Sequence, residues 1–509
     1  MNNINYYRDA QNLPYYLQLT DRSLQPSNET FKEFCEKYID NDANNTKDEK
    51  TRDYKREFYE FLKGKVNDFL GKSRNTSYDH IVLLLGAGAS VVEGKNYGKT
   101  MGQLAWEIFN RISQKNYGKE ITLDNGDLLS YREILKFIPD SEKITLDKDT
   151  KEKIENFPEP KDVSVKWKGT FPLEELISQL DFYIKGNEQL LKLSKDESKK
   201  KHFKRVCNTK NYIIYEIFKN VKYDNLSKDN EFPFNHMAVV LALTKLLKSL
   251  SKKLTVVTTN YDLAIENSLA KRDFTVFNGF NLTNDSIFDE SSFDWVLSKK
   301  VTHLNTEEVI YKPNMINLFK IHGSINWMFD GANTKEVPVD RVEQILLSNV
   351  NSKNNSEKSS KDKKDEVRMI FPSTNKYMQS YEEPYFDLMA RFQEELHKSN
   401  TLLVTSGFSF GDDHISRMVI NAIKHNSSLK CLFTDYGIYN TEFYKYPEKD
   451  SNEETSIEID DKKSESEEDL YGNKNWRELD SLRNEGYDIA FLKATMNDKE
   501  HGLAFFLRG

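Results

Sequence analysis

Two polar motifs in the sequence carry residue types that suit chemistry on a ribose or a water molecule. Asn260 lies in the motif T-T-N-Y-D, directly after the apolar run 254–258. Its amide has both a donor and an acceptor, so it can hold a ribose hydroxyl or orient a water molecule. His322 lies in the motif H-G-S after the apolar run 316–321. An imidazole gains and loses its proton near neutral pH, which suits proton exchange with a hydroxyl or water.

Each of these motifs also has a structural interpretation. Asp262, two residues after Asn260, can accept a hydrogen bond beside a ligand, but it can also cap the following helix, as Asp often does. A lone histidine is more often structural than catalytic. The position of His322 beside a glycine, where a strand ends, favours the functional interpretation.

A glycine-containing motif, Gly86-Ala87-Gly88-Ala89-Ser90, follows the apolar run 81–85. A backbone that turns tightly beside a ligand needs residues with little or no Cβ, and the amides of a helix that starts there suit a pyrophosphate. Val91 stands where the six-residue dinucleotide fingerprint has its third glycine. A simple strand-to-helix turn is therefore the alternative.

A second glycine-containing motif, G-F-S-F-G-D-D-H, occupies residues 407–414. Its two glycines can let the backbone wrap around a nucleotide. Asp413 or Ser409 can cap the helix expected to begin near Ile415. His414 either contacts a ligand or is satisfied structurally.

The elements that must position these motifs alternate between strand and helix. Apolar runs typical of strands buried on both faces lie at 81–85, 254–258, 316–321, 369–371, 401–405, 429–433 and 489–492. Helical patterns lie between them at 236–250, 385–397 and 415–422. This alternation predicts an α/β fold with a doubly wound, mostly parallel Rossmann-like sheet. The carboxyl ends of such strands share one edge, so all four motifs should meet in a single cleft.

Other segments extend or interrupt this sheet. Residues 1–78 predict a helical N-terminal extension for packing or oligomerisation, with helical patterns at 31–39 and 54–70. The Rossmann domain is expected over 79–509. A helical subdomain is expected as an insertion at about 101–233, where helical patterns lie at 102–112, 173–184 and 212–221. Low-complexity surface loops are expected at about 349–365 and 449–469.

Composition excludes several classes of protein. The chain has 509 residues, 38% hydrophobic and 30% charged, which is typical of a soluble globular protein. No apolar run approaches the roughly 20 residues that span a bilayer, and the N-terminus lacks a secretory layout, so a cytoplasmic protein without membrane contact is expected. The chain has a net charge of -8, which does not attract the negatively charged backbone of a nucleic acid, so nucleic acid is not indicated as a partner. The three cysteines lie far apart, which predicts neither a disulfide framework nor a metal site.

Together the four motifs resemble those of the sirtuin-like NAD+ hydrolase family of bacterial anti-phage defence systems. The resemblance spans about residues 81–492, outside the low-complexity loops. It implies that Asn260 and His322 are the catalytic pair and that Asp262 supports them. The residues for which it implies contacts with NAD+ are Gly86, Ala87, Gly88, Ser90, Thr259, Gly407, Ser409 and Asp412.

The resemblance also implies an activity. Members of the family cleave the bond between nicotinamide and ribose, so NAD+ would be a substrate, no metal would be needed, and an infected cell would lose its NAD+ in abortive infection. Such an enzyme needs restraint, which implies a homo-oligomer and, as candidate partners, an ATPase of the HerA type or a phage-derived activator.

Two alternatives stay open at this stage. The first is a non-catalytic sensor that binds NAD+ or ADP-ribose and switches a partner. The second is an NAD+-dependent deacylase. Deacylating sirtuins resemble the first three motifs but carry four zinc-binding cysteines, and this chain has only three cysteines. That shortage counts against a deacylase.

Overall fold

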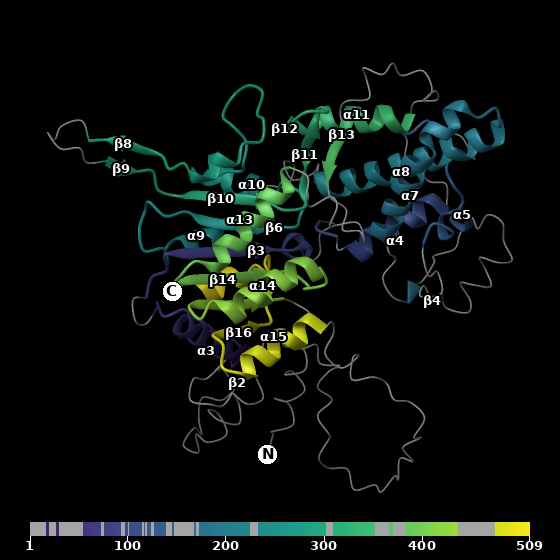
Figure 1. Ribbon diagram of the computed structural model, residues 1–509. Coiled ribbons are helices and arrows are strands. Elements are labelled where there is room, and N and C mark those ends of the chain that lie inside the picture. Colours follow the sequence, from purple (N-terminus) through teal and green to yellow (C-terminus); the bar gives the residue numbers. More distant parts are fainter. Residues whose placement is uncertain are drawn as a thin grey trace, which may run out of the picture.

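The structure is a computed structural model of the chain (Figure 1). It describes residues 17–19, 27–29, 54–72, 76–92, 97–99, 101–113, 117, 120–123, 127–138, 145–146, 167–168, 173–223, 233–301, 309–351, 366–369, 383–435 and 474–508.

At the centre of these residues lies a nine-stranded sheet with the order β2-β1-β16-β15-β14-β3-β6-β10-β7. Its strands are β1 (Leu17–Leu19), β2 (Ser27–Glu29), β3 (His80–Leu85), β6 (Leu254–Thr258), β7 (Thr275–Phe277), β10 (Met315–Lys320), β14 (Thr401–Ser406), β15 (Leu429–Thr434) and β16 (Ile489–Leu492). The seven strands from β16 to β7 are parallel, and β1 and β2 are antiparallel additions at one edge. This parallel sheet confirms the predicted fold class.

The order of the strands follows the Rossmann pattern. From β3 the chain adds β6, β7 and β10 on one side, with β7 outside β10, and afterwards β14, β15 and β16 on the other side of β3. The direction of winding therefore reverses between β3 and β14. In sheets of this kind ligands bind at the carboxyl ends of the strands beside such a reversal.

Helices cover both faces of the sheet (Figure 1). In β3, Ile81, Leu83 and Leu85 point into one apolar cluster, and Val82 and Leu84 into the other, because successive side chains of a strand alternate between faces. The first cluster includes α3 (Tyr54–Phe69), α9 (His236–Thr244), α10 (Ala264–Leu269) and α16 (Leu503–Leu507). The second includes α13 (Tyr385–His397), α14 (Asp413–His425) and α15 (Lys474–Asn484).

A second body of helices lies beside the sheet and has its own apolar core (Figure 1). It contains α4 (Met101–Ser113), α5 (Tyr131–Leu135), α7 (Leu173–Leu193), α8 (Glu197–Lys222) and α11 (Val339–Asn351), together with the sheet of β11 (Gly323–Phe329), β12 (Thr334–Glu336) and β13 (Glu366–Met369). The predicted helical insertion is thus joined by a later segment of the chain, since α11 packs against α8. Lys199 and Lys201, near the start of α8, are exposed.

One predicted strand is in a different sheet. The run 369–371 was expected in the parallel sheet, but β13 ends at Met369 and pairs with β11. A short apolar run specifies burial and not the partner strand, so periodicity alone could not distinguish the two sheets. Residues 370–371 lie outside the described part of the chain.

The N-terminal extension is partly helical. α3 confirms the pattern at 54–70, whereas the pattern at 31–39 falls outside the described residues. β1 and β2 were not predicted, because three-residue strands are too short to show periodicity. β1 pairs with β16, so the start of the chain contributes to the main sheet. The boundary at residue 78 stays a prediction.

Short elements complete the described chain: η3 (Ala87–Ser90), η5 (Ala270–Arg272), η6 (Glu290–Asp294), and two pairs of antiparallel strands, β4 (Thr145–Leu146) with β5 (Trp167–Lys168) and β8 (Ser298–Lys300) with β9 (Val309–Tyr311). Of the predicted loop 349–365, residues 349–351 form the end of α11, and the rest falls outside the described residues, as does the predicted loop 449–469. No helix that the structure describes has the length and apolar character to cross a membrane.

Candidate functional site

The four polar motifs lie at one edge of the sheet. They follow β3, β6, β10 and β14, and these strands are consecutive in the order β14-β3-β6-β10. Because parallel strands all end at the same edge, motifs separated by more than 300 residues in sequence meet there. The four motifs thus share one edge of the sheet, beside its winding reversal, and the single cleft that the sequence predicts for them stays a prediction.

The two glycine-containing motifs pack backbone to backbone. The Gly86 N–H donates to the Ser406 carbonyl over 3.1 Å, and the Gly88 N–H donates to the Gly407 carbonyl over 2.9 Å. A Cβ added to Gly86 would lie 2.4 Å from the Gly407 carbonyl oxygen. These glycines are therefore needed for the contact between the two loops, whatever ligand binds beside them.

The segment after the first glycine differs from expectation. An α-helix was predicted to start there, but the structure has the single 3-10 turn η3, and the next α-helix, α4, begins only at Met101. Asn497, which showed no motif in the sequence, holds this turn in place. Its Nδ2 donates to the carbonyls of Ala89 and Val91 over 2.8 and 2.9 Å, and the residue is buried.

Asn260 is oriented by the first glycine loop. Its Nδ2 donates to the Gly86 carbonyl over 2.9 Å and to Ser90 Oγ over 3.1 Å. A backbone carbonyl can only accept, so the amide nitrogen must face Gly86. The side-chain oxygen of Asn260 is consequently left to accept a hydrogen bond from a water molecule or a hydroxyl. Thr259, its neighbour, donates its N–H to the carbonyl of Leu85 over 3.1 Å.

Asp262 is buried and accepts three hydrogen bonds from the protein. Ser90 Oγ donates over 2.7 Å, the Tyr223 hydroxyl over 3.2 Å, and the N–H of Ala264, at the start of α10, over 3.0 Å. One of its oxygens thus binds the first N–H of α10, although Leu263, and not Asp262 as the capping interpretation has it, is the cap residue of that helix. The other oxygen holds Ser90, which in turn holds Asn260, so Asp262 supports the site through these neighbours.

Two residues that the motifs did not include complete this network. Tyr223 ends α8, and its burial, together with the Asp262 carboxylate, raises the pKa of the Tyr223 phenol well above its ordinary value. Lys320, buried at the end of β10, donates to the Asp262 carbonyl and, over 2.9 Å, to Glu266 Oε1. Both residues brace the loop that carries Asn260.

His322 faces an acidic side chain from the other glycine-containing motif. Its Nε2 lies 3.4 Å from Asp412 Oδ2, and the side chains are 8% and 10% exposed. The other oxygen of Asp412 accepts from the N–H groups of His414 and Ile415 over 3.0 and 3.4 Å. Asp412 is therefore the cap of α14, which corrects the prediction of Asp413 or Ser409.

Ser409 is a predicted site residue whose contacts with Gly411 and Trp476 lead away from the other site residues. It is exposed, its Oγ accepts from the Gly411 N–H over 3.4 Å, and its carbonyl accepts from Trp476 Nε1 over 2.9 Å. Trp476 belongs to α15, on the side of β14 away from β3. A nucleotide contact for Ser409 stays a prediction.

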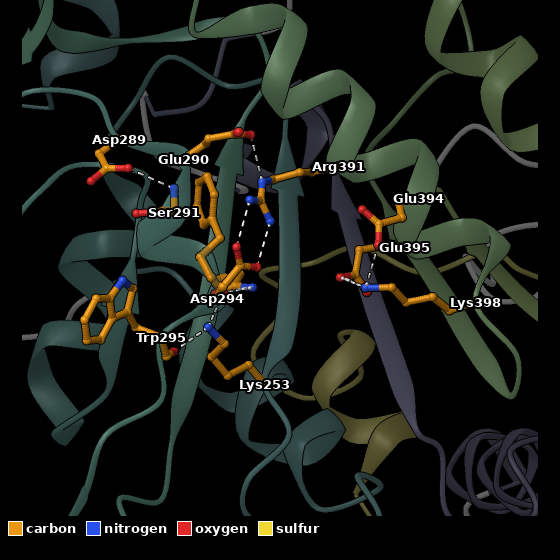
Figure 2. A network of polar contacts seen from close by, with 12 residues as sticks. Lys253, Asp289, Glu290, Ser291, Asp294, Trp295, Arg391, Glu394, Glu395 and Lys398 are labelled. Atoms are coloured by element: carbon orange, nitrogen blue, oxygen red, sulfur yellow. Dashed lines mark hydrogen bonds and ion pairs between the residues drawn. The ribbon is translucent and has the colours of Figure 1, made fainter.

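A concavity lined by charged side chains lies at the opposite edge of the sheet from the four motifs. It has a volume of about 610 Å³, and three of its cations, Lys253, Arg391 and Lys398, are held by neighbouring oxygen atoms (Figure 2). Arg391 forms two parallel bonds with Asp294 over 2.9 and 3.0 Å, and Lys398 donates to Glu395 over 2.9 Å. Lys253 donates to the Trp295 carbonyl over 2.7 Å, and burial lowers its pKa to about 8. This network ties α13 to η6 and leaves the carboxyl-end edge as the better candidate site.

His236, at the start of α9, gives the region around Asp262 a pH-dependent stability. The ring is buried, and burial lowers its pKa to about 4, although the Asp262 carboxylate opposes this shift. The unfolded chain, with an ordinary histidine, binds the proton at higher pH than the folded chain does. The contribution of the neutral His236 ring to the free energy of unfolding is therefore complete above about pH 6.5, and it declines as the pH falls towards about 4.

We expect the free energy of unfolding to fall by about 2 kcal/mol between pH 7 and pH 5 through His236 alone. Urea denaturation of the full chain at both pH values measures this loss. In His236→Gln the loss between pH 7 and pH 5 should be smaller by the contribution of His236. His425→Gln, which changes an exposed histidine, is the matched control and should keep the wild-type pH dependence. Equal pH dependence in wild type and His236→Gln would contradict the assignment.

Among the described residues there is no group of three or more His, Cys, Asp or Glu side chains that could hold a metal ion. Cys431 lies buried in the second apolar cluster.

Comparison with known proteins agrees with this geometry over part of the chain. No curated protein matches the sequence. The family model described as the SIR2-like domain matches residues 254–436, which include Asn260, Asp262, His322 and the second glycine-containing motif. SIR2-like domains bind NAD+ and are in general NAD+-utilising enzymes. The matched residues thus support a sirtuin-like family for this chain.

Proposed function

We propose that the protein hydrolyses NAD+ to nicotinamide and ADP-ribose. The observation that carries the proposal is the orientation of Asn260 at the winding reversal of the sheet. Its amide nitrogen is held by Gly86 and Ser90, and its oxygen is available to a water molecule. The match to the SIR2-like domain supports NAD+ as the molecule bound there.

The reaction needs no strong nucleophile. The bond between ribose C1′ and the nicotinamide nitrogen breaks, and its electron pair neutralises the pyridinium ring, which makes nicotinamide a good leaving group. The ribose passes through an oxocarbenium-like state, and a water oxygen held by Asn260 forms the new bond to C1′. His322 holds the ribose hydroxyls and accepts the proton that the water releases.

The two packed glycine-containing loops complete the proposed site. The loop from Gly86 to Ser90 lies at the end of β3, beside the end of β14, where a Rossmann-like sheet binds its nucleotide. Small residues there let a pyrophosphate approach the backbone closely. We assign Gly86, Ala87, Gly88, Ser90 and, with them, Thr259 and Gly407 to this role.

The biological setting is proposed on the resemblance alone. It comprises depletion of NAD+ during antiviral defence in the cytoplasm, a homo-oligomeric assembly, and control by an ATPase of the HerA type or a phage-derived activator. Light scattering of the full chain across concentrations tests the assembly, and a strict monomer would contradict it.

The proposed reaction is tested with the purified full chain and NAD+, following nicotinamide and ADP-ribose by chromatography. Equal amounts of the two products, appearing with time, are the expected result. Saturable binding of NAD+ without either product, in the presence and absence of the candidate partners, would favour the non-catalytic sensor. Products that form only when an acylated peptide is added would favour a deacylase.

A further inference from the structure

The carboxylate of Asp412 is divided between two functions. Oδ1 accepts from the first N–H groups of α14 and holds the start of that helix. Oδ2 lies 3.4 Å from His322 Nε2. His322 follows β10 and Asp412 follows β14, and β3 and β6 lie between these strands in the sheet. The two segments therefore reach towards each other across the strand ends that carry the candidate site.

We infer that Asp412 is a positioning residue for His322 and not a contact for the nucleotide. The inference rests on the proposed hydrolysis of NAD+. Of the two tautomers of a neutral imidazole, a carboxylate beside Nε2 favours the one with its hydrogen on Nε2, so that Nδ1 carries the lone pair that can accept a proton. Both side chains are largely buried, which limits the ring orientations that the pair can adopt.

Charge argues for the same role. The resemblance implied that Asp412 contacts NAD+, but a carboxylate repels the pyrophosphate of a dinucleotide. Asp412 already interacts with the helix amides through one oxygen and with the imidazole through the other. In this arrangement it contributes to the reaction through His322.

Asp412→Asn separates the two functions of the carboxylate. Asparagine caps helices about as well as aspartate, so its oxygen can keep the contacts with the N–H groups of His414 and Ile415. Its amide nitrogen then faces His322 Nε2 and can only donate, which forces the ring hydrogen to Nδ1. The variant should therefore fold normally with the wrong tautomer at His322.

For Asp412→Asn we expect kcat for NAD+ hydrolysis to fall about 10- to 100-fold while KM changes less than about threefold. Asp413→Asn is the matched control, because it removes the same charge one residue away. Asp413 is exposed and bonds Lys474 and Asn475 over 2.8 and 3.0 Å, so its replacement should leave kcat within about twofold. An unchanged kcat in Asp412→Asn would overturn the inference. A rise in KM alone would also overturn it, and would favour a contact between Asp412 and the nucleotide.

A measurement without turnover separates this inference from the proposed function. In ¹⁵N spectra of histidine-labelled full chain, the His322 signals are identified by their loss in His322→Gln. We expect the Nε2–H tautomer in wild type and the Nδ1–H tautomer in Asp412→Asn. If wild type does not hydrolyse NAD+ but the tautomer changes, the proposed function fails and the pairing stands. The same tautomer in both proteins would overturn the pairing.

Discussion

Replacing Asn260 with alanine is expected to lower the turnover of NAD+ at least ~100-fold, the usual scale for a positioned catalytic group. The substitution removes the oxygen proposed to orient the attacking water. It also removes the Nδ2 bonds to Gly86 and Ser90, which fix that oxygen in place. Chromatography of nicotinamide and ADP-ribose under saturating NAD+ measures the loss in kcat.

Two further variants define what this loss means. Asn421→Ala removes an exposed asparagine from α14, away from the strand ends, and should retain wild-type turnover. Asn260→Asp keeps the size of the side chain, but a carboxylate cannot donate to the Gly86 carbonyl, so it too should be inactive. Near wild-type turnover in Asn260→Ala would rule out the water-positioning role and leave NAD+ hydrolysis without its main support.

The parallel core could be predicted because its strands are short apolar runs that end in glycine or polar residues. Six of the seven predicted runs are strands of the main sheet, and the predicted helix 385–397 coincides with α13. β7 was missed, because it is a three-residue strand at the sheet edge whose burial is only partial. The strand-end motifs could be placed together because parallel strands end at one edge.

Contacts between distant residues could not be predicted in the same way. Tyr223 ends a helix of the inserted subdomain, 39 residues before Asp262, and its neighbours in sequence carry no motif. Asn497 lies 408 residues after Ala89, whose carbonyl it binds. Asp412 was found in a motif, but its partner His322 belongs to another strand end, and periodicity does not show which side chains face each other. Such pairings depend on the packed tertiary structure, which one sequence does not show.

Gly407→Ala is expected to destabilise the fold by about 3–5 kcal/mol. Gly407 has a φ of +63°, in the left-handed region that side chains disfavour. A Cβ there would lie 2.1 Å from the Ala89 nitrogen and 2.3 Å from the Gly88 carbonyl carbon. Both are backbone atoms of the facing glycine loop, so the clash can be relieved only if the loops separate. Urea denaturation of the full chain measures the change in the free energy of unfolding.

The matched control is Gly186→Ala in α7, where an added Cβ meets no atom within 4 Å. Alanine favours a helix over glycine, so this variant should be more stable than wild type by up to about 1 kcal/mol. If the glycine-to-alanine change lowers the free energy of unfolding at Gly407 but raises it at Gly186, the loss at Gly407 results from the contact between the loops. If Gly407→Ala is instead as stable as wild type and binds NAD+ normally, the loops are not packed this closely, and Gly86 and Asn260 would lose the geometry on which the proposed site depends.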